Sequence, residues 1–264
     1  MIADFYINGF SALTGDADAA SFAPYFEARR LRRMETIAKN ALLCSCRAFD
    51  LAGIDIHAPK ETGLSVAAGA GSLESTCKFM DSIIDDGDEL SSPTAFAGSV
   101  HNSTGLTLSV FLHLNGPCVT TGQFDFSFAG ALLTAREFLK RGLCREALVA
   151  VAEDINPSAA LLAPKNPELF APVLRGPQGP FTRAAAAFVI SAEPTENTRF
   201  AVTDFHFSRT DAPAAPCSSF PSAAACALET AARLQTGKPF VLRDVFGGVE
   251  LRLEAEPYVN EKRH

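Results

Sequence analysis

Residues 116 to 132 read GPCVTTGQFDFSFAGAL. We expect a buried strand from Pro117 to Thr121 and an apolar helix from Ser127 to Arg141, joined by a sharp turn that holds Asp125. The free N–H groups and the dipole at a helix N-terminus converge on one spot. The sequence therefore predicts that this turn directs the Asp125 side chain towards the spot that the helix N-terminus faces.

This stretch resembles the active-site segment of the β-ketoacyl synthases, a branch of the thiolase-like superfamily. In that family Gly-Pro opens a strand, and the nucleophilic cysteine stands at the tenth position, on the turn into a helix that begins with small residues. Counted from Gly116, the tenth position holds Asp125. The resemblance implies the frame of a condensing enzyme without its thiol.

Three further segments are similar to the same family. Residues 5–10 (FYINGF) resemble its first strand, and residues 69–75 (GAGSLES) resemble its glycine turn before a helix. Residues 92–102 (SPTAFAGSVHN) resemble a run in the shortened ketosynthase-like branch. The resemblance is firm from about Arg32 to Asp154, and it implies a truncated thiolase-like α/β fold with mixed sheets covered by helices.

We expect residues 1–264 to form one ketosynthase-like domain, with an N-terminal thiolase-like half at 1–192 and a reduced C-terminal remnant at 199–264. Apolar spacing of three and four predicts one helix from Arg29 to Ala52, ended by Gly53. The other expected helices are 72–86, 106–114 and 222–234, the last stopped by Gly237. The other expected strands are 63–71, which runs into a glycine turn, 146–154, 184–192, 199–207, 240–242 and 249–253, with loops at 156–180 and 211–216.

Composition bounds the class of protein. With 264 residues and 47% hydrophobic content, the chain can bury roughly three quarters of its unfolded surface. Its longest uncharged apolar run, Ala184 to Ile190, is far below the ~18 residues that a membrane span needs. Asp4 stands where a signal peptide would carry lysines, so we expect a soluble, cytoplasmic protein. A formal net charge of −7 argues against a nucleic-acid surface.

Neither a metal nor a nucleotide cofactor is expected. Seven cysteines without regular spacing indicate reduced thiols, and Cys44 and Cys46 lie two apart on a predicted helix, where they do not share a face. The pattern G-x-G-x-x-G fails at Glu74, whose carboxylate would repel a pyrophosphate. The sequence therefore predicts no cofactor.

Two polar groups outside the turn have alternative interpretations. The cluster Arg29, Arg30, Arg32 and Arg33 is either a solvated helix edge or a docking patch for an acidic acyl carrier protein. His101 and Asn102 precede an apolar helix in a region that supplies pocket wall and dimer contacts in the resembled family, and we expect His101 to be a hydrogen-bonded structural histidine. The predicted strand 146–154 ends in Glu153 and Asp154, and we expect Glu153 to take a structural hydrogen bond.

A condensing enzyme needs a thiolate, and histidines that support decarboxylation and hold the oxyanion. Asp125 cannot carry a transferable thioester, and beyond Asp154 the chain offers only His206 and His264. Cys118, on the predicted buried strand, and Cys217, in a loop, lack a basic partner nearby in sequence. The sequence therefore predicts no autonomous catalysis.

The resemblance implies a subunit like the chain length factor of type II polyketide synthases, paired with an active ketosynthase, with an acyl carrier protein as a further partner. It points towards the aryl polyene pathway. In such pairs the strand before the nucleophile position crosses the interface, which here comprises Pro117, Cys118, Val119, Thr120 and Thr121. We expect Gln123, Phe124, Phe126, Phe128, His101 and Asn102 to border the tunnel that holds the growing chain.

The local geometry leaves two arrangements of the phenylalanines open. If the strand continues through the turn, Phe124, Phe126 and Phe128 share one face; if the helix begins earlier, Phe124 and Phe128 stack. Alternatively, the phenylalanines are simply core and Asp125 caps the helix. Two other functions also stay open, namely an acyltransferase or decarboxylase with an unrecognised nucleophile and a homodimeric acyl-binding scaffold.

Overall fold

The computed structural model describes residues 3–86, 91–153, 183–210 and 222–260. Its elements are, in chain order, β1 (Phe5–Thr14), η1 (Ala19–Phe22), α1 (Ala28–Leu31), α2 (Thr36–Ala52), β2 (Gly63–Ala67), α3 (Leu73–Asp86), α4 (Pro93–Ser99), α5 (Ser103–Phe111), β3 (Cys118–Thr121), α6 (Ser127–Lys140), β4 (Glu146–Glu153), β5 (Ala184–Ser191), β6 (Phe200–Arg209), α9 (Ala223–Gln235), β7 (Phe240–Phe246) and β8 (Val249–Pro257). The predicted loops at 156–180 and 211–216 lie outside the described residues.

The strands form a single eight-stranded sheet in the order β3-β2-β4-β5-β1-β6-β8-β7. β2 runs parallel to β3 and β4, and the remaining pairs are antiparallel. The expected α/β class with a mixed, helix-covered sheet is thus confirmed. Although β5 and β6 follow each other in the chain, they do not pair, because β1 lies between them.

Two hydrophobic cores lie on opposite faces of this sheet. On β5, Ala186, Phe188 and Ile190 point into the core beneath α6 and α9, whereas Ala187 and Val189 point into the core beneath α2 and α5. This alternation follows from the two-residue period of a strand that is buried on both faces.

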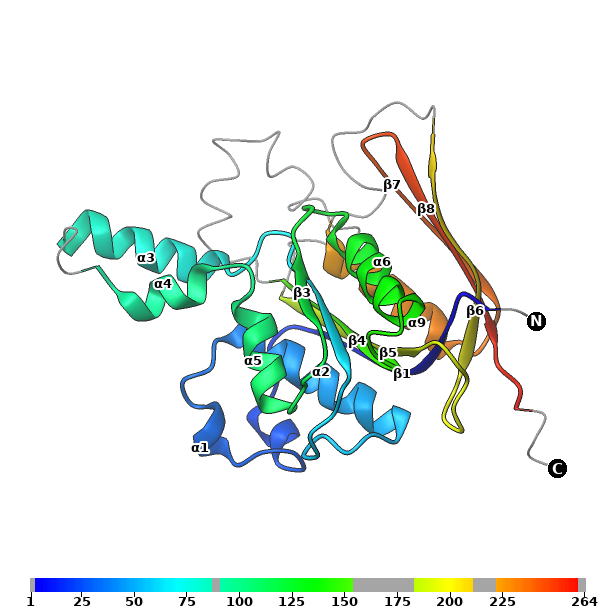
Figure 1. Cartoon of the computed structure of the whole chain (residues 1–264). Helices are drawn as coiled ribbons and strands as arrows, with labels where there is room; N and C mark the ends of the chain where they lie inside the picture. The colour runs from blue at the N-terminus through cyan, green and yellow to red at the C-terminus, as the bar shows by residue number, and fades with distance from the viewer. Residues whose placement is uncertain (1–2, 87–90, 154–182, 211–221, 261–264) are drawn as a thin grey trace.

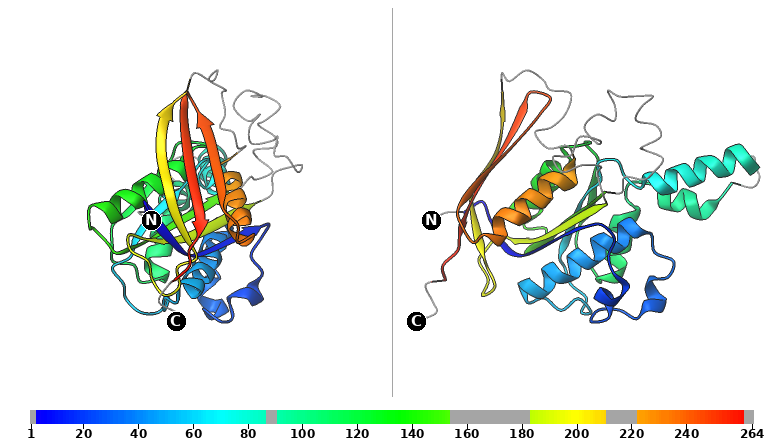
Figure 2. Two further views of the ribbon diagram at one scale, coloured as in Figure 1. Left: turned by 90° about the vertical axis from the view of Figure 1, so that its right-hand side faces the viewer. Right: turned by 180° about the vertical axis from the view of Figure 1, so that it is seen from behind.

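The last three strands wrap around the α6 and α9 layer (Figures 1 and 2). Leu242, Leu251 and Leu253 from β7 and β8 join the same core as α6 and α9. On the other face of β8 stand Glu250, Arg252, Glu254 and Glu256, as expected for an antiparallel strand with one wet face. Between residues 199 and 264 the described chain thus supplies α9 and three strands that continue the same sheet.

The helix predicted from Arg29 to Ala52 is wrong in its first part. The structure has two helices, α1 and α2, because Glu35 is extended and stands before α2. Its carboxylate accepts hydrogen bonds from the hydroxyls of Ser72 and Ser75 at the start of α3. A long-range contact thus ends the helical run, and at its other end Gly53 takes the expected left-handed conformation, with φ 69°.

The first strand is longer than the predicted segment 5–10, since β1 continues through Gly9 to Thr14. Gly9 is needed there because a Cβ at this position would lie 2.0 Å from the carbonyl oxygen of Ala48. The helix α2 therefore packs directly on the backbone of β1. In the described part of the chain, we find no helix with the length and apolar character to cross a bilayer.

Candidate functional site

The turn from β3 into α6 is held by one hydroxyl. Ser127 Oγ accepts a hydrogen bond from the Gln123 amide at 2.8 Å and donates one to the Phe124 carbonyl at 2.6 Å. The Phe126 amide also donates to the Gln123 carbonyl. The predicted strand, turn and helix are confirmed, with a sharp turn closed by the first residue of α6.

Phe124 stands at the apex of the turn in a left-handed conformation, with φ 49°. Its side chain is 67% exposed, and its carbonyl oxygen faces Gly69, where a Cβ would lie 2.9 Å away. A non-glycine residue rarely adopts this backbone region, and it costs about 1–2 kcal/mol. The strained turn therefore presents a large aromatic side chain to the surface.

Asp125 points inwards and forms an acidic pair with Glu153 of β4. The two residues are 8% and 4% exposed. Glu153 accepts a hydrogen bond from the Ala224 amide at the start of α9, at 3.1 Å, so its predicted structural hydrogen bond is confirmed. Burial raises the pKa of Glu153 to about 7. The hydrogen bonds from Ser222 and Ala224 act to lower this pKa, and the charge of Asp125 acts to raise it.

The N-cap position of α6 belongs to Phe126, which has no side chain that could accept a hydrogen bond. The position that the resembled family gives to a nucleophile thus holds a carboxylate beside a second buried carboxyl group. A charge on Asp125 opposes the ionisation of Glu153, because two like charges in a buried site repel each other.

Both predicted arrangements of the phenylalanines are wrong. The strand ends at Thr121 and the helix begins at Ser127, so Phe124 points to solvent, Phe126 into a cluster beside β7, and Phe128 into the core. The Phe126 ring stacks on Phe246 with centroids 5.9 Å apart, and Phe128 packs against Phe188 at 5.3 Å. Phe128 is therefore core, as the alternative interpretation held.

A groove of about 560 Å³ runs beside the turn. Its walls include Gln123, Phe124 and Phe126 from the turn, Leu133 from α6, and Phe207, Phe246 and Val249 from the C-terminal strands. None of the residues that line it is charged. The sequence prediction missed Leu133, Phe207, Phe246 and Val249 as walls of this groove. Gly247 and Gly248 indicated a tight turn between two strands, but no local pattern showed that this hairpin packs against α6.

β3 is not buried as predicted. It is an edge strand that pairs with β2 alone, and Cys118 and Val119 are exposed while Thr120 and Thr121 are half-buried. Pro117 just before it is also half-buried. In the described chain the outer side of β3 is therefore free to meet another surface.

Exposed apolar residues continue from β3 along neighbouring helices. α5 lies against β3, since a Cβ at Gly105 would contact Thr120 Oγ1 at 3.2 Å. The exposed apolar side chains of this strip are Val119 on β3, Leu106 and Val110 on α5, Phe96 on α4, and Met80 and Ile84 on α3. Figures 1 and 2 show α3 and α4 extending away from the sheet as an arm. We call these six residues the apolar strip.

His101 and Asn102 lie at the surface beside the turn. The His101 ring packs against Gly71 and Gly122, where a Cβ would lie 3.2 Å and 3.6 Å from it. It makes no hydrogen bond with another described residue, in contrast to the predicted hydrogen-bonded histidine. Its place next to Gly122 does bring it to the β3–α6 turn.

The four arginines divide into two groups. Arg29 forms an ion pair with Glu27 at 2.6 Å, and Arg30 lies over the rings of Phe26 and Phe111. Arg32 and Arg33 instead line a groove of about 270 Å³ together with Lys78 and Glu35. Arg32 and Arg33 thus line a hollow at the surface, whereas Arg29 and Arg30 contact other side chains of the described chain.

Three of the described cysteines are poorly suited to act as nucleophiles. Burial raises the pKa of Cys44 and Cys46 to about 12 and also raises that of Cys118, the opposite of what a reactive cysteine needs. Cys217 and His264 lie outside the described residues. Among the described residues no group of three or more His, Cys, Asp and Glu side chains could hold a metal ion.

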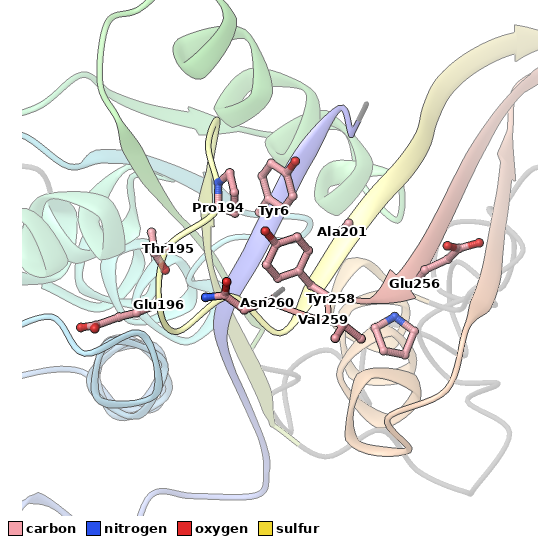
Figure 3. Close-up of a pocket in the computed structure, with 10 residues that line it drawn as sticks. Tyr6, Pro194, Thr195, Glu196, Ala201, Glu256, Tyr258, Val259 and Asn260 are labelled. Atoms are coloured by element: carbon pink, nitrogen blue, oxygen red, sulfur yellow. The ribbon is translucent and has the colours of Figure 1, made fainter. Parts of the chain in front are cut away.

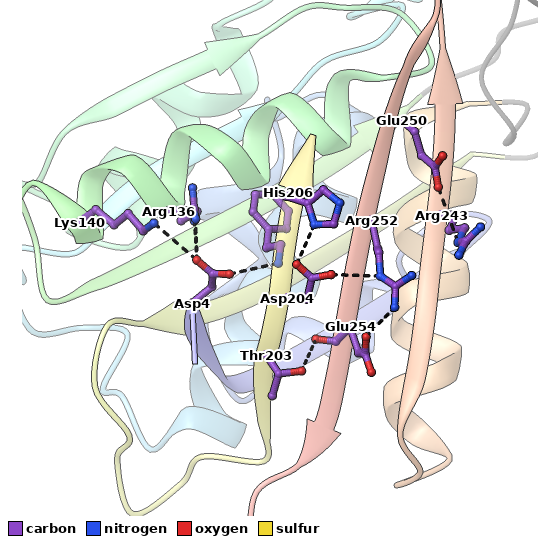
Figure 4. A network of polar contacts seen from close by, with 11 residues as sticks. Asp4, Arg136, Lys140, Thr203, Asp204, His206, Arg243, Glu250, Arg252 and Glu254 are labelled. Atoms are coloured by element: carbon purple, nitrogen blue, oxygen red, sulfur yellow. Dashed lines mark hydrogen bonds and ion pairs between the residues drawn. The ribbon is translucent and has the colours of Figure 1, made fainter. Parts of the chain in front are cut away.

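Two further surfaces lie elsewhere. A cavity of about 660 Å³ is lined by Tyr6, Tyr258 and neighbouring residues (Figure 3). On the outer face of β6, β7 and β8, Arg252 binds Asp204 and Glu254, and Arg243 binds Glu250 (Figure 4). His206 contacts Asp204 at 2.7 Å on this face, so it belongs to a polar network rather than to the turn.

The sequence from residue 10 to residue 192 matches the family described as the N-terminal domain of β-ketoacyl synthases. The chain belongs to this family, and its fold is the thiolase-like α/β fold of ketosynthases. No curated protein sequence matches the chain.

Solved structures of low sequence identity share the fold. The ishigamide ketosynthase/chain length factor is 16% identical, with a TM-score of 0.72 over 97% of this chain and 99% of that one. The ketosynthase ApeO in complex with its chain length factor ApeC, from Xenorhabdus doucetiae, is 14% identical, with a TM-score of 0.65 over 95% and 98%. AntDE:AntF, a type II polyketide carrier protein in complex with its ketosynthase, is 12% identical, with a TM-score of 0.76 over 96% and 99%.

Proposed function

We propose that this protein is a non-catalytic, chain-length-factor-like subunit that pairs with an active β-ketoacyl synthase. The observation that carries the proposal is the open edge of β3 in the described chain. This strand carries the exposed Val119 of the apolar strip and leads directly into the turn with Asp125. An unpaired strand edge near exposed apolar side chains is typical of a subunit interface. Pro117 to Thr121 form the centre of this interface.

The buried acidic pair supports the non-catalytic part of the proposal. Asp125 cannot form a transferable thioester, and its neighbour Glu153 is a carboxyl group rather than a histidine or lysine that could support decarboxylation. The partner subunit therefore catalyses the condensation. A catalytic role for this chain alone would need a nucleophile other than the buried thiols Cys44 and Cys46.

We propose that the groove beside the turn contributes to the tunnel for the growing polyketide or polyene chain. Its uncharged aromatic lining suits an apolar, unsaturated chain. Phe124, Phe126 and Gln123 border it, whereas Phe128 supports the turn from the core. His101 and Asn102 stand at the interface side of the same turn.

Arg32 and Arg33 are the proposed docking group for an acyl carrier protein, since exposed guanidinium groups bind carboxylates and phosphate. Lys78, which lines the same groove, is paired with Glu74. Arg29 and Arg30 are already engaged within the chain. We place the protein in the cytoplasm and in aryl polyene biosynthesis, with residues 1–192 as the thiolase-like half and 199–264 as the reduced C-terminal part of one domain.

The first test is affinity purification of the tagged protein from its own cells, with mass spectrometry and the molar mass of the complex. We expect a full-length ketosynthase in equal amount. A stable homodimer without a ketosynthase would instead support the acyl-binding scaffold. A monomer with thioesterase, acyltransferase or decarboxylase activity that is lost on replacement of one cysteine would support the autonomous enzyme.

Replacing Phe124 with alanine is expected to lengthen the product of the complex by at least one extension step, because an exposed ring at the groove is removed. The product is measured by mass spectrometry of the reconstituted reaction. Since Phe124 is largely exposed, the variant should fold and bind its partner. Unchanged product length in an intact complex would contradict the tunnel role.

A further inference from the structure

The loop between α5 and β3 contains an asparagine followed by a glycine, Asn115 and Gly116. Asn115 is exposed and lies outside the helices and strands. Its own backbone amide donates to the Lys60 carbonyl at 2.8 Å. Among the described residues, however, neither the side chain of Asn115 nor the backbone amide of Gly116 has a hydrogen-bond partner. The side-chain carbonyl carbon of Asn115 and the next amide nitrogen are thus both free to react with each other.

The fold requires a glycine at position 116. A Cβ at this position would lie 2.5 Å from the carbonyl oxygen of Thr62, and Thr62 is itself buried. The next residue, Pro117, accepts the Leu64 amide at 2.8 Å as the loop enters the sheet. The close packing at the start of β3 thus demands the one residue type that leaves the amide after Asn115 unhindered by a side chain.

Two other asparagines each lack one of these features. Asn8 also precedes a glycine, but it lies within β1, is 1% exposed, and has both ends of its side-chain amide hydrogen-bonded. Asn102 is exposed, but a serine follows it, and the amide of that serine donates to the Val100 carbonyl at 3.0 Å. In the described chain, Asn115 therefore combines an exposed side chain with a following glycine whose amide is free.

We propose that Asn115 is a site of spontaneous deamidation, the reaction that makes asparagine a labile residue. The Gly116 nitrogen forms a bond to Cγ of Asn115, the bond from Cγ to Nδ2 breaks, and ammonia leaves with the proton of the Gly116 amide. Water then opens the resulting succinimide ring at either of its carbonyl carbons. One product is aspartate, and the other is isoaspartate, in which the main chain runs through the former side chain. This inference does not depend on the proposed subunit role.

Either product changes the entry into the edge strand β3. Both replace a neutral amide with a negative charge, and isoaspartate adds one atom to the main chain directly before Gly116. Because Gly116 is packed against the Thr62 backbone, the longer chain must displace the contacts that hold the start of β3 to β2. We therefore expect the isoaspartate form to unfold at a lower temperature than the unmodified protein.

Incubation of the purified, folded protein at mildly alkaline pH, followed by proteolysis and mass spectrometry, tests the site, because alkali ionises the attacking amide. We expect Asn115 to convert more than about tenfold faster than Asn8, whose reaction requires a buried strand to open, and also faster than Asn102. Methylation by protein isoaspartyl methyltransferase identifies the isoaspartate product. Conversion of Asn115 no faster than that of Asn102, or conversion only after unfolding in urea, would overturn the proposal.

Variants connect the modification to its position. Asn115→Gln is expected to lose most of the isoaspartate signal, because the longer side chain would have to close a larger and slower ring. Asn102→Gln is the matched control and should leave the signal at its wild-type level. After equal incubation, wild type should contain a fraction of lower melting temperature that Asn115→Gln lacks. Equal isoaspartate labelling of wild type and Asn115→Gln would show that the modification lies elsewhere.

Discussion

Replacing Glu153 with glutamine is expected to stabilise the protein above pH 7 and to flatten its stability between pH 4.5 and 7. In the folded protein the pKa of Glu153 is raised to about 7 from an ordinary value of 4.5. Because the pKa of Glu153 is raised on folding, the protonated carboxyl group contributes stability. This contribution is fully present below the unfolded pKa of 4.5 and is lost as the pH rises through the folded pKa of about 7. The wild type should therefore lose on the order of 3 kcal/mol across this window.

A glutamine keeps an oxygen for the Ala224 amide and offers an amide donor to Asp125, without a charge. We expect the melting temperature at pH 8 to rise by roughly 5 °C or more. Thermal unfolding of the purified chain at several pH values measures both effects. The control is Glu61→Gln, since Glu61 is exposed, and it should leave the wild-type profile unchanged.

Asp125→Asn tests whether the two carboxyl groups are coupled. Removing the charge of Asp125 should lower the pKa of Glu153, so that the loss of stability becomes smaller and moves to lower pH. If Asp125→Asn and wild type have the same pH profile, the acidic pair does not act as described, and Asp125 faces a different group.

Replacing Val119 with arginine is expected to weaken the complex with the ketosynthase by at least about a hundredfold. Val119 is 41% exposed in the described chain and lies at the centre of the proposed interface, where an arginine would be buried without a partner. Titration of the purified ketosynthase, followed by light scattering or calorimetry, measures the change.

A matched control lies on β7, which forms the opposite edge of the same sheet. Val241 on β7 is 37% exposed, so Val241→Arg introduces the same charge on an edge strand of similar exposure. The outer face near it carries paired charges and should remain in water. Equal affinity of Val119→Arg and Val241→Arg for the ketosynthase would place the interface elsewhere, whereas failure of wild type to bind any ketosynthase would refute the proposed function itself.

Much of the fold follows from the sequence alone. The helix α9 begins after Ser222, which accepts the Ala225 amide, and is followed by Gly237 in the left-handed conformation, as its capping pattern predicts. The strand, turn and helix around Asp125 were also predicted within a residue or two. These features depend on neighbouring residues, because capping, glycine conformation and the spacing of apolar side chains act over a few positions.

Other features required distant parts of the chain to meet. Glu35 interrupts a helical pattern because Ser72 and Ser75 at the start of α3 bind its carboxylate. β3 is exposed because no further strand among the described residues pairs with it. The partnership of Asp125 with Glu153, and of Phe126 with Phe246, joins segments that no local pattern connects. The sequence by itself thus determined the family, most of the elements and the carboxylate in the turn. Only the tertiary structure decided which groups surround that carboxylate and which edge stays open, because burial and strand order arise from contacts between remote segments.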